Sequence, residues 1–184
     1  MGTKRNQRST VEARWEKKEV VGRVVKEKFE AEKVLGPLQA KTDTQRHYIQ
    51  SLKYNKITVA SGHAGCGKSY CATYMAAQLL NSGKIEKIVL TRPYAHLGKD
   101  YGATPGTDNE KLEPFMRPML DVLKKALGEG KYQYCLDTKK LEIAPLEKIQ
   151  GRSFDEPCVI ICDESQCATK PQILSLVTRL GTIS

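Results

Sequence analysis

The sequence predicts an α/β fold, in which helices cover both faces of a mostly parallel sheet. Short apolar or β-branched segments alternate with helical segments from about residue 42 onward, as in chains built from strand–helix–strand units. The segment 158–162 is apolar at every position, which is typical of a parallel strand covered on both faces. Right-handed crossovers place the loops after such strands at one edge of the sheet, so we expect the functional residues there.

Residues 1–41 predict a basic N-terminal helical arm and linker ahead of a domain at 42–184. Residues 11–35 lack proline and are rich in Glu, Lys and Arg, which favours a helix that Gly36-Pro37 ends. Residues 1–41 hold eleven Lys and Arg against six acidic residues, within a chain of formal net charge +9. A basic arm is typical of proteins that bind polyanions such as nucleic acid, although a solvated basic helix gives the same pattern.

The first elements of the domain surround a glycine-rich loop. Residues 42–52 begin with polar N-cap candidates and predict a short helix. The β-branched segment 56–61, "KITVAS", predicts a strand that leads directly into the loop. After the loop, residues 69–80 have high helix propensity up to the stop signal Asn-Ser-Gly. Residues 87–92 predict a second strand, which a proline closes.

The second half of the domain continues the alternation. Residues 97–114 are rich in Gly, Pro, Asp and Thr and predict a loop. A helix is predicted over 115–127 and a short strand over 141–145. The strand predicted at 157–165 is apolar and ends in two acids. The last element is a helix over 171–180 with proline in its first turn.

The stretch "GHAGCGKS" at 62–69 matches the pattern G-x-x-x-x-G-K-[ST], between a predicted strand and a predicted helix. Small residues let backbone N–H groups face phosphate oxygens, and the N-terminus of the following helix adds positive charge. In this pattern the lysine contacts the β- and γ-phosphates, and the serine hydroxyl contacts Mg²⁺. An ordinary glycine-rich turn is the alternative. The residues expected to bind the nucleotide, which the family resemblance described below identifies as ATP, are Gly62, His63, Ala64, Gly65, Cys66, Gly67, Lys68, Ser69 and Tyr70.

The segment "CVIICDE" delivers Asp163 and Glu164 to the same edge of the predicted sheet. One carboxylate can hold Mg²⁺ and the next can deprotonate an attacking water, which favours hydrolysis of a nucleoside triphosphate. The pair can alternatively serve as negative charge at a helix N-terminus. Gln45 and Gln166 carry amides that can pair with adenine, although either alone is equally consistent with a surface residue.

The composition argues against membrane and secreted classes. No apolar run approaches the roughly 20 residues that span a bilayer, and no apolar segment follows the basic N-terminus as in a secretory signal. The cysteines form no C-x-x-C pair and the three histidines are scattered, so we expect no zinc site and reduced core cysteines in a cytoplasmic protein. The six cysteines are Cys66, Cys71, Cys135, Cys158, Cys162 and Cys167.

Several blocks together resemble the PhoH-like ATPase family in order and spacing, over about residues 42–182. They are "GHAGCGKSY", "IVLTRPYAHLG", "PGTDNEKLEPFMRPMLD", "LEIAPLEKIQGRSFDEPCVIICDESQ" and "LVTRLG". The resemblance implies a RecA-like P-loop NTPase core related to superfamily 1 helicases. It also implies a cytoplasmic, ATP-binding protein that uses Mg²⁺ and acts on RNA or single-stranded nucleic acid. For full-length members of the family it implies a homo-oligomeric ring. The short basic N-terminus resembles the form found in bacteriophages.

The resemblance also assigns roles to single residues. It implies that Gln45 reads adenine, that Ser69 and Asp163 hold Mg²⁺, and that Glu164 and Gln166 take part in catalysis with Lys68. Ser165 stands where the family has alanine in this acidic motif. Four arginines fall in family blocks, and any one could be an arginine finger, with a structural ion pair as the alternative; Arg179 is the favoured candidate. The four are Arg92, Arg117, Arg152 and Arg179.

The resemblance further implies a sheet strand after the "TRLG" helix, between the phosphate-loop strand and the acidic strand. We therefore expect this chain to be an N-terminal part of the domain, incomplete at its C-terminus. Direct pairing of the two flanking strands, or a strand from another chain, are the alternatives. For function, the alternatives to a Mg²⁺-dependent ATPase are a nucleotide-binding module without hydrolysis and the N-terminal part of a split helicase-like motor.

Overall fold

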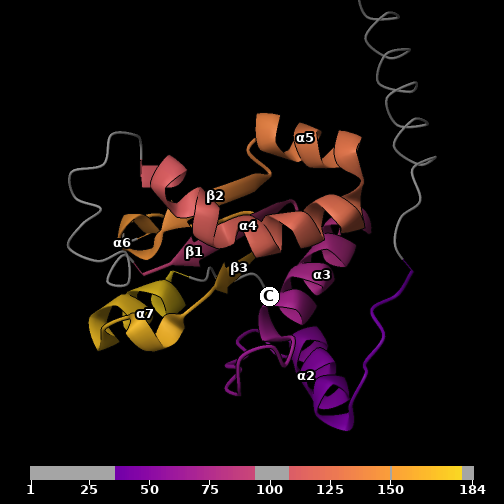
Figure 1. Cartoon of the computed structure of the whole chain (residues 1–184). Helices are drawn as coiled ribbons and strands as arrows, with labels where there is room; N and C mark the ends of the chain where they lie inside the picture. Colours follow the sequence, from indigo (N-terminus) through magenta and orange to yellow (C-terminus); the bar gives the residue numbers. More distant parts are fainter. Residues whose placement is uncertain (1–35, 94–107, 150, 180–184) are drawn as a thin grey trace, which may run out of the picture. The chain divides into compact units, whose positions relative to one another are not determined.

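The computed structural model describes residues 36–93, 108–149 and 151–179 (Figure 1). The chain divides into two units, Met1–Val34 and Leu35–Ser184, and the described residues belong to the second. The predicted helical arm therefore lies outside the described residues, as does Gly181 after the last helix. Within the described part of the chain, no helix has the length and apolar character needed to cross a membrane.

A parallel three-stranded sheet forms the centre of the second unit. Strand β1 (Lys87–Arg92) lies between β2 (Leu141–Pro145) and β3 (Cys158–Cys162). Ile88 is aligned with Leu141 on one side and with Val159 on the other. Residues 88–90 of β1 are fully buried because the central strand is covered on both edges and both faces. The predicted α/β class with a parallel sheet is confirmed.

One face of the sheet is covered by α3 (Lys68–Asn81), α4 (Asp108–Leu127) and α5 (Glu129–Asp137). Figure 1 shows α3 and α4 side by side on this face. The main core lies here, where Ala77 of α3 and Leu123 of α4 are completely buried with Ile88 and Leu90 of β1. These apolar contacts fix α3, and therefore the loop before it, against the sheet.

The opposite face is covered by α6 (Leu146–Ile149) and α7 (Lys170–Thr178). Ile149 of α6 and Leu176 of α7 join Val89 of β1 in a smaller cluster that also contains Phe154. Helices therefore lie on both faces, as predicted. Thr169 caps α7, because its hydroxyl accepts from the Gln172 N–H while the Gln172 side chain accepts from the Thr169 N–H.

Helix α2 (Asp43–Tyr54) precedes the phosphate-loop stretch and confirms the helix predicted at 42–52. Thr42 is its N-cap, and the Thr42 hydroxyl accepts from the backbone N–H of Gln45 at 3.2 Å. Ile49 of α2 packs in a buried cluster with Cys71 and Met75 of α3. This packing holds α2 next to the start of α3.

The loop predicted at 97–114 is wrong for its last seven residues, because α4 begins at Asp108. The Gly- and Pro-rich sequence around the start of α4 favoured a loop prediction. The helix nevertheless has a stripe of apolar side chains spaced three or four residues apart. The stripe is buried against the sheet, which outweighs the cost of Pro114 and Pro118 inside the helix. Helices α5 and α6 were not predicted either. The buried stripe consists of Leu112, Met116, Met119, Leu123 and Leu127.

The strand predicted at 56–61 is also wrong, because residues 57–61 pair with no strand among the described residues. Val59 is 86% exposed and Ile57 is 49% exposed. A side chain connects this segment to α2, since the Thr58 hydroxyl donates to the Ser51 carbonyl at 3.2 Å. β-Branched residues favour a strand only where neighbouring strands supply hydrogen bonds and packing.

Strand β3 is less buried than its apolar sequence predicts. All five residues, Cys158–Cys162, are only partly buried, because β1 lies on one edge and no described strand lies on the other. The expectation that Cys158 and Cys162 are buried core residues is therefore wrong. All six cysteines are free thiols, but only Cys71 and Cys135 are buried.

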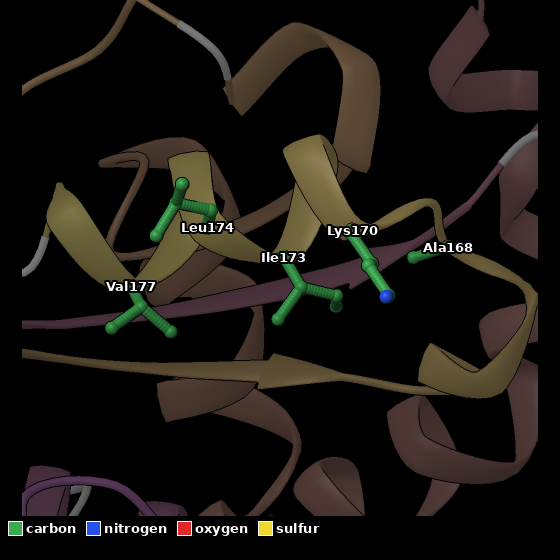
Figure 2. A pocket seen from close by; sticks show the side chains of 5 residues that line it. All are labelled: Ala168, Lys170, Ile173, Leu174 and Val177. Atoms are coloured by element: carbon green, nitrogen blue, oxygen red, sulfur yellow. The ribbon is translucent and has the colours of Figure 1, made fainter.

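A shallow apolar groove of about 360 Å³ lies on α7. Figure 2 shows Ile173 and Val177 pointing to the same side of the helix. Leu174 is 65% exposed. The groove is lined by Ala168, Lys170, Ile173, Leu174 and Val177, so it includes no residue of the 62–69 loop.

Candidate functional site

The 62–69 loop has the backbone shape that its glycines allow. Gly65 has φ of 78° and Gly67 has φ of 90°, in the left-handed region that side chains with a Cβ rarely adopt. Gly67 is the N-cap of α3, and its carbonyl accepts from the Cys71 N–H at 2.9 Å. The free N–H groups at the start of α3 therefore lie next to the loop, as an anion-binding helix terminus requires.

The Lys68 ammonium group is turned back onto the loop. Its Nζ donates to the carbonyls of Gly62 at 2.7 Å and His63 at 2.9 Å, and to the Cys66 thiol at 3.5 Å. These bonds close the loop around the ammonium group and place a positive charge inside it. Cys66 itself is exposed.

Gln45 of α2 lies against the 62–69 loop, although it precedes Cys66 of that loop by 21 residues. Its Nε2 donates to the Cys66 carbonyl at 3.0 Å, and its Oε1 accepts from the Lys41 N–H at 2.8 Å. A Cβ on Gly67 would lie 3.1 Å from the same Nε2. The structure thus brings Gln45 to the loop predicted to bind nucleotide, with its amide engaged by backbone groups.

Tyr48 is a loop-supporting residue that the sequence analysis missed. Its hydroxyl donates to the Lys68 carbonyl at 3.3 Å, and burial, followed by the nearby Cys71 and Cys66 thiols, raises its pKa to about 12. Tyr48 follows Gln45 by one helical turn, so the two share a face of α2. The spacing of three residues from Gln45 could therefore have identified Tyr48 from the sequence.

Ser69 and Asp163 meet at the carboxyl edge of the sheet, although they are 94 residues apart. The Ser69 hydroxyl donates to Oδ1 of Asp163 at 2.9 Å. Asp163 follows β3, and its N–H donates to the Thr91 carbonyl of β1 at 2.9 Å. The sheet thereby fixes the position of the carboxylate relative to α3. Both groups offer the hard oxygen atoms that Mg²⁺ prefers, so this pair fits a magnesium site.

Glu164 stands beside this pair with an unusual backbone. It has φ of 51°, in the left-handed region, and its carboxylate accepts a hydrogen bond from the Gln166 side-chain amide. Such a conformation in a residue other than glycine is costly and recurs at functional sites. Gln166 is exposed in the 3₁₀ turn Ser165–Cys167, where it contacts Glu164 rather than the 62–69 loop.

The four candidate arginines occupy different places. Arg92 ends β1, and its Nη1 lies 4.0 Å from Oδ2 of Asp163. Arg152 pairs with Glu142, near the amino end of β2 and away from the 62–69 loop. Arg117 of α4 and Arg179 at the end of α7 are exposed. Of the four, Arg92 is the one that the structure places next to the acidic pair.

Comparisons with known proteins show which family the chain resembles. Residues 37–184 match the family model described as PhoH-like protein. The chain is 39% identical over 147 residues to Protein PhoH of Escherichia coli K12, covering 79% of this chain and 41% of that protein. It is 39% identical over 144 residues to a PhoH-like protein of Bacillus subtilis, covering 78% and 45%. A PhoH-like protein of Synechocystis is 35% identical over 144 residues, covering 78% and 44%.

The chain spans less than half the length of these curated relatives. The family match nevertheless covers most of the chain, including the 62–69 loop, the acidic strand and α7. The fold predicted from the loop and from the alternation of elements agrees with it. The chain therefore belongs to the PhoH-like protein family, whose domain has the P-loop NTPase fold.

Proposed function

We propose that this chain binds ATP with Mg²⁺ at the 62–69 loop and hydrolyses it. The observation that carries the proposal is the hydrogen bond of 2.9 Å between Ser69 and Asp163. It joins the loop that would hold the phosphates to the strand that would supply the acids. A glycine-rich turn with no catalytic role would not require an acid from a distant strand beside it.

Each group has a role that its position supports. The loop N–H groups and Lys68 would bind the phosphates, with Gln45 beside the loop on the side of α2. Ser69 and Asp163 would hold Mg²⁺, which supplies charge neutralisation at the β- and γ-phosphates. Glu164 would take a proton from the attacking water, and its bond from Gln166 would orient the carboxylate. Tyr70 is 49% exposed on the first turn of α3, so its ring would be accessible to the base or ribose.

We also propose a single-stranded nucleic acid, RNA in the first instance, as a partner of this chain. The support is charge, since residues 1–34 hold ten Lys and Arg against six acidic residues. A homo-oligomeric ring would let an arginine of one copy reach the nucleotide of another. The exposed Arg117 and Arg179 are candidates for that arginine.

The test measures nucleotide binding and phosphate release separately. We expect a fluorescent ATP analogue to bind in a Mg²⁺-dependent manner, and Lys68→Ala to weaken binding at least tenfold. Glu164→Gln should keep binding within about threefold while it lowers the ATPase rate by roughly 10²–10⁴-fold. The matched control is Glu86→Gln, an exposed carboxylate at the amino end of β1.

Two results would contradict the proposal in different ways. If Glu164→Gln hydrolyses ATP at the wild-type rate, Glu164 is not the base. If the wild type binds ATP but releases no phosphate, with or without single-stranded RNA, the chain is a nucleotide-binding module and the hydrolysis proposal is wrong.

A further inference from the structure

Arg92 lies where the carboxyl ends of two neighbouring strands meet. It is the last residue of β1, and Asp163 comes directly after β3. The bond of 2.9 Å from the Asp163 N–H to the Thr91 carbonyl fixes the two backbones at this point. The spacing of Arg92 and Asp163 is therefore a property of the sheet and does not depend on a flexible loop.

The Arg92 side chain is held in place on both sides. It is only 15% exposed, and its guanidinium carbon lies 5.3 Å from the centre of the Phe115 ring of α4, within the range of a cation–π contact. Its Nε is buried and has no hydrogen-bond partner among the described residues. Leaving a charged donor buried without a hydrogen bond costs free energy.

Asp163 divides its two carboxylate oxygens between different partners. Oδ1 accepts from Ser69 at 2.9 Å, while Oδ2 faces Nη1 of Arg92 at 4.0 Å. The second distance is too long for a hydrogen bond, so the guanidinium attracts the carboxylate by charge alone. The other nearby cation, Lys68, is bound to loop carbonyls instead. The charge of Oδ2 is thus balanced by Arg92, and no hydrogen bond from another described residue to Oδ2 accompanies this ion pair.

We infer that Arg92 is a positioning residue that competes with Mg²⁺ for Asp163 and so sets the Mg²⁺ concentration at which the nucleotide site loads. The inference rests on the proposed function of the same site. Without a metal, the fixed charge of Arg92 orients and balances the Asp163 carboxylate. A divalent cation on that carboxylate is repelled by the guanidinium a few ångströms away, so the site binds Mg²⁺ less tightly than the Ser69–Asp163 pair alone would.

The experiment titrates Mg²⁺ against the full-length chain and a fluorescent N-methylanthraniloyl-ADP, with no hydrolysis required. We expect Arg92→Gln to lower the Mg²⁺ concentration for half-maximal nucleotide binding by roughly five- to twentyfold, because the competing charge is gone. Arg92→Lys keeps the charge and should stay within about threefold of the wild type. Arg152→Gln, which removes an arginine paired with Glu142 away from the 62–69 loop, should leave the titration unchanged.

A merely structural arginine would give a different pattern. Its loss would lower the melting temperature but leave the Mg²⁺ midpoint of the folded protein unchanged, and that result would overturn the inference. An increased midpoint in Arg92→Gln would overturn it too, as would equal shifts in the Gln and Lys variants. If Arg92→Gln does not fold, Arg92→Met keeps an apolar stem against Phe115 and provides the same neutral comparison.

The proposed function fails in a distinguishable way. If wild-type nucleotide binding does not respond to Mg²⁺ at all, then both the metal site and the competition are wrong. If the wild type responds and Arg92→Gln has the same midpoint, only the role of Arg92 is wrong.

Discussion

Gly67 shows how a single atom can decide whether the loop keeps its shape. Its φ of 90° is unfavourable for any residue with a Cβ, and that Cβ would also lie 3.1 Å from the Gln45 amide. The second effect is specific to the loop, whereas backbone strain would arise at any left-handed glycine. A second left-handed glycine outside the loop shows what backbone strain alone costs in stability.

Gly67→Ala and Gly83→Ala form a matched pair. Gly83 has φ of 70° and open space around the position of a Cβ. We expect each variant to lose about 1–2 kcal/mol of unfolding free energy through left-handed strain, measured by urea denaturation. Only Gly67→Ala should also weaken binding of a fluorescent ATP analogue, by at least tenfold. Equal nucleotide affinities in the two variants would mean that the shape of the loop at Gly67 has no bearing on nucleotide binding.

The strands differ in how much of the fold's stability they carry. Ile88 of β1 is fully buried, whereas Ile161 of β3 packs against the same core cluster but is only partly buried. A buried isoleucine loses both its transfer free energy and its packing when it is truncated. A partly exposed one gives up less, since water already reaches part of its surface.

Ile88→Ala and Ile161→Ala test this difference with the same chemical change. We expect Ile88→Ala to cost about 3–5 kcal/mol of unfolding free energy and Ile161→Ala about half as much. Chemical denaturation followed by circular dichroism measures both. Should the two costs be equal, β3 would be as well covered in solution as β1, by something other than the described strands.

We expect the two units of the whole molecule to bind different ligands. The unit Leu35–Ser184 contains the 62–69 loop, both acids and the sheet. Residues 1–34 contribute ten basic and six acidic side chains, which act on polyanions over a distance that salt limits. Nucleotide binding should therefore depend on the second unit and nucleic-acid binding on the first.

Deleting residues 1–34 tests this division. We expect Mg²⁺-dependent binding of a fluorescent ATP analogue to stay within about threefold of the full-length chain. Binding to single-stranded RNA should weaken and become less sensitive to salt, since fewer counterions are released. Fluorescence anisotropy at several salt concentrations measures the slope. A slope equal to that of the full-length chain would show that the basic residues of 1–34 do not contact the RNA.

The sequence by itself determined the α/β class, the helices at 42–52 and 69–80, the strands at 87–92 and 141–145, and the glycine, lysine, serine and acid pattern of the proposed site. These features depend on local patterns, because a phosphate loop needs small residues at fixed spacing and a buried parallel strand needs an apolar run. The spacing of its apolar residues could have predicted that α4 begins near residue 108, but the two prolines inside the helix argued against it.

Only the tertiary structure decided the remaining features. Residues 57–61 pair with no described strand, because the hydrogen bonds of a strand come from distant segments and β propensity cannot supply them. The partial burial of β3 also depends on distant segments, because an apolar sequence does not determine which strands lie beside it. The contacts of Asp163 with Ser69 and Arg92 join the turn after β3 to α3 and β1, since the carboxyl ends of parallel strands converge at one edge of a sheet. A sequence motif identifies the residues expected at that edge, whereas the sheet determines which of their side chains are in contact.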